Sequence, residues 1–101
     1  MNEKITVLIS DDNNEFATTL ANYLEKDEDM HVVGMAKDGE EALSIISTLK
    51  PDVVLLDVIM PHLDGLGVLE RLNSMRLEKR PICIMLSAVG QDKITQKAIS
   101  L

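Results

Sequence analysis

Four residues with chemically useful side chains stand where short apolar runs of this sequence end. Asp11 and Asp12 come just after ITVLI and one serine, Asp57 follows VVLL, and Ser87 follows ICIML. Three carboxylates brought together would repel one another, and at least one pKa would rise unless a cation joined them. The pattern therefore indicates a metal site, provided that the runs end at the same place in the fold.

The ion that fits such a set of ligands best is Mg²⁺. It prefers oxygen ligands, keeps several waters, and takes one or two carboxylates together with phosphate oxygens. Mn²⁺ accepts the same ligands, and Ca²⁺ is expected only as a substitute because the number of ligands is low. These preferences match a small open acidic site better than a closed cage of ligands.

Each of these residues alone also has a simpler interpretation. Asp11 and Asp12 precede a predicted helix, where Asp is a common N-cap. Asp57 alone could be a turn residue, and Ser87 alone carries still less weight. The placement of all four residues after three different apolar runs is what favours a functional site.

The elements that must position these residues alternate along the chain. Apolar, β-branched runs predict strands over 5–9, 31–36, 53–56 and 82–86, and apolar residues at helical spacing predict helices over 14–26, 40–49, 65–75 and 91–101. The apolar face is expected to consist of Phe16, Leu20, Tyr23 and Leu24 in the first helix, and of Leu66, Leu69 and Leu72 in the third. Three of the runs, 5–9, 53–56 and 82–86, are continuous rather than alternating, as in a parallel sheet covered on both faces, whereas the more polar 31–36 suits an edge. The alternation predicts a doubly wound α/β fold, in which ligands bind beyond the carboxyl ends of the strands.

Composition limits the classes of function. The 101 residues are enough for one domain, with 46% hydrophobic and 27% charged residues. A formal net charge of −7 argues against direct nucleic-acid binding by this segment. The single cysteine, Cys83, offers no internal disulfide, and no apolar stretch approaches the roughly 20 residues that cross a bilayer. We therefore expect a cytoplasmic protein with no membrane contact.

The D-x-x-M-P-x-x-D-G string over residues 57–65, with Asp11, Asp12 and Ser87, resembles the response-regulator receiver family along the whole chain. The resemblance implies a flavodoxin-like doubly wound parallel sheet, and Asp57 as the acceptor of a phosphoryl group from a histidine kinase or histidine phosphotransferase. It also implies Mg²⁺ held by Asp11, Asp12, Asp57 and the backbone carbonyl of Ile59, with Ser87 as a switch hydroxyl. Such a protein is a phosphoacceptor that slowly loses its phosphate and is not a turnover enzyme.

Some features of that family have no counterpart in the sequence. The family's lysine after a fifth strand, and the switch aromatic in that strand, are not found. We therefore expect residues 1–101 to be a receiver domain shortened at its C-terminus, without the fifth strand and fifth helix. An uncovered fourth strand would be an apolar edge, which predicts a homodimer and allows for exchange of elements between copies.

Within the family, residues 51–57, 59–72 and 84–92 are similar to receivers of sporulation transcription regulators from endospore-forming bacteria. That similarity implies a DNA-binding output domain in the full-length protein, switched by phosphorylation-driven dimerisation. Two other hypotheses stay open. One is a degenerate receiver that acts only as an interaction module. The other is a Mg²⁺-dependent hydrolase of the haloacid-dehalogenase type, which carries its nucleophile in a D-x-D motif after the first strand.

Overall fold

The computed structural model describes residues 3–86, which form a parallel sheet with helices on both faces. The elements are β1 (Ile5–Ser10), α1 (Asn14–Glu25), β2 (Met30–Ala36), α2 (Gly39–Leu49), β3 (Val53–Asp57), α3 (Gly65–Ser74) and β4 (Ile82–Leu86). The strand order is β2-β1-β3-β4 and each neighbouring pair is parallel. This confirms the doubly wound α/β architecture for the described residues, and the helix predicted over 91–101 lies outside them.

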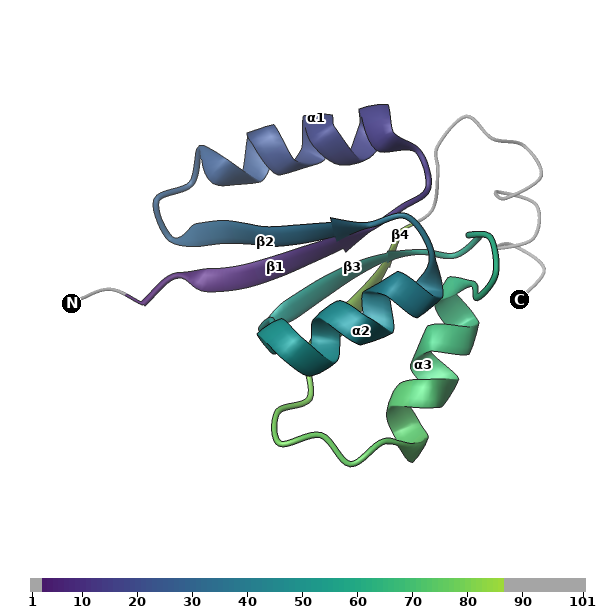
Figure 1. The fold of residues 1–101 in the computed structure, drawn as a ribbon. Helices are drawn as coiled ribbons and strands as arrows, with labels where there is room; N and C mark the ends of the chain where they lie inside the picture. The colour runs from purple at the N-terminus through teal and green to yellow at the C-terminus, as the bar shows by residue number, and fades with distance from the viewer. Residues whose placement is uncertain (1–2, 87–101) are drawn as a thin grey trace.

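Each helix covers one face of the sheet, and which face it covers depends on whether the chain is moving toward β2 or toward β4. Figure 1 shows α1 over one face of β1 and β2, with α2 and α3 under the other face. The chain passes from β1 outward to β2 and then crosses back to β3 and β4, so right-handed crossovers place the later helices opposite α1. The reversal lies between β1 and β3, which is where such folds bind ligands.

Two strands run one residue further than predicted, up to the edge where the site lies. Ser10 still pairs with Ala36 and Leu56, and Asp57 still pairs with Leu86. Asp57 is therefore the last residue of β3 and does not follow it. The predicted edge position of the second strand is confirmed, because β2 pairs only with β1 in the described sheet.

Two apolar layers cover the sheet. Successive residues of a strand point to opposite faces, so Leu8 joins the layer under α2 and α3, while Val7 and Ile9 pack against α1. The larger layer contains Leu8, Ala36, Ala42, Leu43, Ile46, Val54, Leu56, Met60, Val68 and Leu72. The end of β1 is therefore buried from both sides, which gives the residues after it a rigid support.

The helix faces that pack on the sheet differ in part from those predicted. In α1 the predicted Phe16 and Tyr23 are 46% and 70% exposed, whereas Ala17 is buried. In α3 the predicted Leu66 is exposed, and Val68 is buried beside the correctly predicted Leu72. The buried face of each helix is therefore rotated relative to the face that helical spacing alone predicts.

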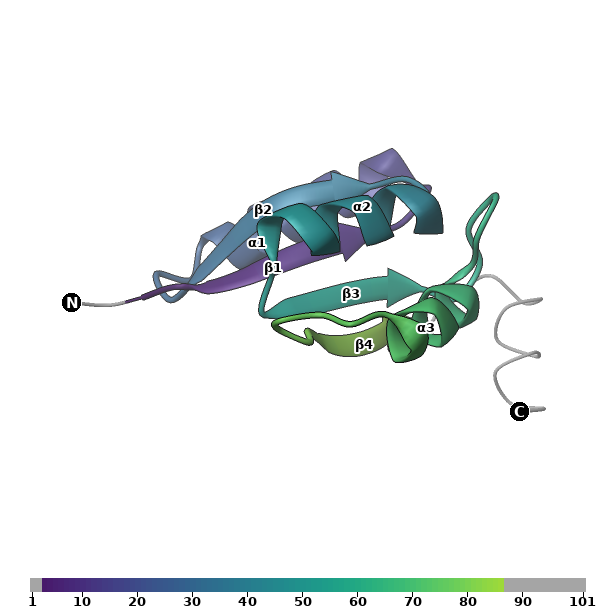
Figure 2. The same ribbon diagram turned by 60° about the horizontal axis from the view of Figure 1, so that its bottom comes forward.

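The α1 face of β4 carries an exposed apolar strip. Ile82 and Ile84 are 66% and 48% exposed, and they lie in register beside Val53 and Leu55 of β3. The expectation that all three continuous apolar strands are covered on both faces is therefore wrong for β4 in the described part of the chain. Figure 2 shows β4 as the outermost strand of this sheet.

Near the amino-terminal ends of the strands, the carboxylate of Asp52 connects several segments. Oδ2 of Asp52 accepts hydrogen bonds from the backbone N–H of Thr6 at 2.8 Å and from the Thr6 hydroxyl at 3.0 Å. Lys79 donates to the other carboxylate oxygen, and the Ile82 N–H donates to the Asp52 carbonyl at 2.9 Å. These contacts hold β1, β3 and β4 in register.

Among residues 3–86, no helix is long and apolar enough to cross a membrane.

Candidate functional site

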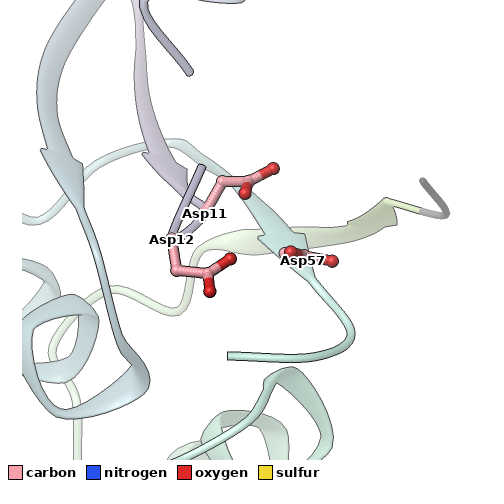
Figure 3. Close-up of side chains that lie close together, drawn as sticks. All are labelled: Asp11, Asp12 and Asp57. Carbon is pink, nitrogen blue, oxygen red and sulfur yellow. The ribbon is translucent and has the colours of Figure 1, made fainter. Parts of the chain in front are cut away.

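Three carboxylates meet where β1 and β3 end. One carboxylate oxygen from each of Asp11, Asp12 and Asp57 lies within 4.8 Å of the others. Figure 3 shows the three side chains projecting to the same side, Asp11 and Asp12 from the segment after β1 and Asp57 from the tip of β3. Asp11 and Asp57 are buried, and Asp12 is exposed. The predicted convergence of these residues is therefore present in the structure.

The segment after β1 leaves these carboxylates available. The N-cap of α1 is Asn13, whose side-chain oxygen accepts the Phe16 N–H at 3.0 Å. Asp11 turns the chain locally, because its Oδ1 accepts the Asn13 N–H at 2.8 Å. The alternative interpretation that Asp11 or Asp12 caps the helix is therefore wrong.

The buried carboxylate of Asp57 is held in an unfavourable environment. Burial, followed by the nearby negative charge of Asp11, raises the pKa of Asp57 from 3.8 to about 6. The Ile59 N–H, 3.4 Å from Asp57 Oδ1, opposes this shift only in part. A hard cation between the three carboxylates would relieve both effects, so the residues present fit a divalent ion with oxygen ligands.

The loop between β3 and α3 lies beside this cluster and is fixed by backbone contacts. The Gly65 N–H donates to the Val58 carbonyl at 3.0 Å, and the Gly39 N–H donates to the Leu63 carbonyl at 2.9 Å. Ile59 is exposed, and its carbonyl accepts no hydrogen bond from any residue between 3 and 86. Within the described residues, no contact of that carbonyl competes with its predicted role as the fourth protein ligand.

The same loop contains a residue with a positive φ, a backbone conformation that residues other than glycine rarely adopt. His62 has a φ of 68°, and the Leu63 N–H on one side of it donates to the Pro61 carbonyl on the other at 2.7 Å. Such a three-residue turn costs roughly 1–3 kcal/mol for a residue other than glycine. His62 is exposed, and it is not among the residues that meet at the cluster.

Sequence reasoning missed one contact next to the carboxylates. The hydroxyl of Ser10 donates to the thioether sulfur of Met60 at 3.2 Å, and the two residues are 50 positions apart. Met60 is buried in the core, whereas Met35 is 43% exposed. No spacing rule links two such distant positions, so only the fold brings this pair together.

Ser87, the remaining one of the five predicted site residues, lies outside the described residues. Its role as a switch hydroxyl stays a prediction.

The fold and the site together define a doubly wound α/β domain with an acidic cluster at its topological switch point. The chain matches the model of the response regulator receiver domain over residues 7–101. It is similar to the signal receiver domain of NarL from Mycobacterium tuberculosis, with 35% identity, a TM-score of 0.75, and coverage of 97% of this chain and 77% of that one. It is also similar to the response regulator domain of CheB from Thermotoga maritima, with 36% identity, a TM-score of 0.74, and coverage of 97% and 72%.

This chain belongs to the response regulator receiver domain family. A third solved structure, the signal receiver domain of a response regulator from Bermanella marisrubri, has 28% identity and a TM-score of 0.75 over 97% of this chain and 79% of that chain. The predicted family is therefore confirmed, and so is the arrangement of the described strands and helices.

Proposed function

We propose that this receiver domain is a Mg²⁺-dependent phosphoacceptor in which Asp57 takes up the phosphoryl group. The observation that carries the proposal is the meeting of Asp11, Asp12 and Asp57 within 4.8 Å at the end of the sheet. Asp57 is the buried carboxylate at the tip of the central strand β3, where a reacting group is held rigidly. Rigid placement matters because phosphoryl transfer depends mainly on positioning and on charge neutralisation.

The metal would be held by Asp11, Asp12, Asp57 and the backbone carbonyl of Ile59. Mg²⁺ is the expected ion, with Mn²⁺ as an alternative and Ca²⁺ as a substitute. When bound, it supplies positive charge that keeps Asp57 ionised at neutral pH and offsets the charge of the incoming phosphoryl group.

The chain's own part in the reaction begins with the ionised Asp57. A carboxylate oxygen of Asp57 attacks the phosphorus of a phosphohistidine on a histidine kinase or histidine phosphotransferase. The bond between phosphorus and the histidine nitrogen breaks, and the nitrogen keeps the electron pair. The product is an acyl phosphate on Asp57, which Ser87 would recognise through its hydroxyl. Water later hydrolyses this bond, so the domain stores a signal and is not a turnover enzyme.

The finer assignment is to a cytoplasmic regulator of sporulation. The string over residues 59–72 and its similarity to the receivers of such regulators support this assignment. The full-length protein would carry a DNA-binding output domain, and phosphorylation would switch its dimerisation. The receiver itself would not touch nucleic acid, because its net charge is −7.

A test of the phosphoacceptor uses acetyl phosphate as donor and intact mass as the readout. With Mg²⁺ the chain should gain one phosphoryl group, and the gain should disappear with EDTA or in Asp57→Asn. Asp64→Asn is the matched control, because Asp64 belongs to the same motif but caps α3, a task that Asn performs equally well. A gain that persists in Asp57→Asn would contradict the assignment of the acceptor. No gain with Mg²⁺ would favour a degenerate receiver that only binds partners.

A further inference from the structure

One polar side chain is buried completely in the core next to the candidate metal site, and the phosphoacceptor chemistry does not use it. Ser10 has no exposed surface, and its hydroxyl donates to Met60 Sδ at 3.2 Å. A buried hydroxyl without a partner costs about 1–3 kcal/mol, so this contact is what makes a serine acceptable at the position. A thioether is only a weak acceptor, however, and the bond adds little to stability by itself.

The contact joins the two halves of the proposed ligand set. Ser10 is the last residue of β1 and precedes Asp11 and Asp12 directly. Met60 follows Ile59 directly, so its position determines where the peptide carbonyl of Ile59 lies. The Ser10–Met60 hydrogen bond therefore links the segment 10–12 with the segment 57–60 through two side chains that are not themselves proposed ligands.

Met60 is also the part of the loop that is anchored in the core. Its side chain is 6% exposed and belongs to the apolar layer under α2 and α3, whereas Ile59 on one side and Pro61 on the other are exposed. The backbone hydrogen bonds that tie this loop to the starts of α3 and α2 are at Val58 and Leu63, on either side of residues 59 and 60. The side chain of Met60 is therefore what fixes the middle of the loop.

We propose that the Ser10–Met60 contact is a positioning element that sets the separation of the two ligand halves and thereby the preference for Mg²⁺ over Ca²⁺. The inference rests on the proposed function. Mg²⁺ requires near-octahedral geometry with ligands at about 2.0–2.1 Å, whereas Ca²⁺ accepts about 2.3–2.6 Å and irregular arrangements. A looser separation between Asp11 and Asp12 on one side and the Ile59 carbonyl on the other therefore weakens Mg²⁺ binding more than Ca²⁺ binding.

The test compares the affinities for Mg²⁺ alone and for Ca²⁺ alone by amide chemical shifts in NMR titrations of the full chain at fixed ionic strength. Ser10→Ala removes the donor, and Met60→Leu removes the acceptor at similar volume. Each should raise the Mg²⁺ dissociation constant about fivefold, less than the loss of a direct partner of a metal ligand, and should change that of Ca²⁺ less than twofold. The double variant should be no worse than either single one, because both remove the same contact.

Ile46→Val is the control for a purely structural effect. Ile46 is 1% exposed in the same apolar layer but lies on α2, and its truncation weakens the core without touching the contact. The ratio of the two dissociation constants should stay unchanged in this variant. An equal loss of Mg²⁺ and Ca²⁺ affinity in Ser10→Ala, or additive effects in the double variant, would overturn the inference and leave the phosphoacceptor intact. Failure of the unsubstituted chain to bind Mg²⁺ would overturn both.

Discussion

The ionisation of Asp57 opposes folding when no metal is bound. The pKa of Asp57 in the folded state is raised to about 6, mainly by burial, so the folded chain holds this proton more tightly than the unfolded chain. Stability from this group is therefore fully present below pH about 4 and is lost as the pH rises through about 6. The site resembles many functional sites in that it carries charges at the expense of stability.

Asp57→Asn should therefore stabilise the metal-free protein at pH 8. The expected gain in unfolding free energy is about 1–3 kcal/mol, and it should vanish near pH 4. Urea denaturation in EDTA at the two pH values measures it. Asp29→Asn, on an exposed turn, should show no such gain. A variant that is less stable than the parent at pH 8 would show that Asp57 is not strained by its surroundings.

Adding Mg²⁺ should reverse the order of stability. The cation removes the repulsion in the parent chain and binds less well to the variant that lacks one carboxylate. The midpoint of thermal unfolding of the parent should rise with Mg²⁺ concentration, whereas that of Asp57→Asn should rise much less.

Among the elements, the start of α2 and the loop after β3 pack backbone against backbone. A Cβ on Gly39 would lie 2.2 Å from the carbonyl oxygen of Leu63, which is closer than any real contact. Gly39→Ala should therefore displace residues 58–64 and cost about 1–3 kcal/mol, measured by urea denaturation. Gly34→Ala is the matched control, because its Cβ would meet only side chains at ordinary distances of 3.7 Å and more. Equal stabilities of the two variants would contradict the close packing.

The contribution of Asp52 to the stability of the sheet should depend on pH. The Lys79 ammonium, followed by the Thr6 N–H, lowers the pKa of Asp52 to about 2. A carboxylate whose pKa is lower in the folded state stabilises above its unfolded value of 3.8, and this stability is lost as the pH falls toward 2. Asp52→Asn should cost about 1 kcal/mol at pH 7, after allowance for solvent screening, and much less at pH 2.

Urea denaturation at pH 7 and pH 2 measures this dependence. Glu78→Gln breaks the neighbouring Lys50–Glu78 pair, in which the Glu78 side chain is 82% exposed, and should hardly change stability at either pH. An Asp52→Asn variant with the same loss at both pH values would mean that hydrogen bonding alone, without charge, holds this edge.

The sequence predicted every strand and helix that the structure describes, and it predicted which carboxylates converge. It succeeded because the alternation of apolar runs determines a parallel sheet, and a parallel sheet places all strand ends together. It was wrong about Phe16 and Leu66, since helical spacing alone does not say which part of an apolar face has room against the sheet. The Ser10–Met60 contact could not be predicted from the sequence, because this contact depends on two side chains meeting across the core.

For the molecule as a whole, the apolar strip on β4 bears on association. Exposed Ile82 and Ile84 on an edge strand favour contact between copies, as the expected homodimer requires. Ile84→Thr should shift sedimentation at high concentration toward the monomer while barely changing stability. Leu49→Gln, at a residue 52% exposed on α2, should leave association unchanged. A parent chain that sediments as a monomer at all concentrations would contradict this expectation.

Because the strands are parallel, their carboxyl ends form one rim of the sheet and their amino ends form the other. One rim bears the acidic residues, and the other bears the contacts of Thr6, Asp52 and Lys79 that hold the strands together. Substitutions that strengthen the contacts among Thr6, Asp52 and Lys79 should therefore raise the stability of the domain without disturbing Asp57, the proposed phosphoacceptor at the opposite ends of the strands.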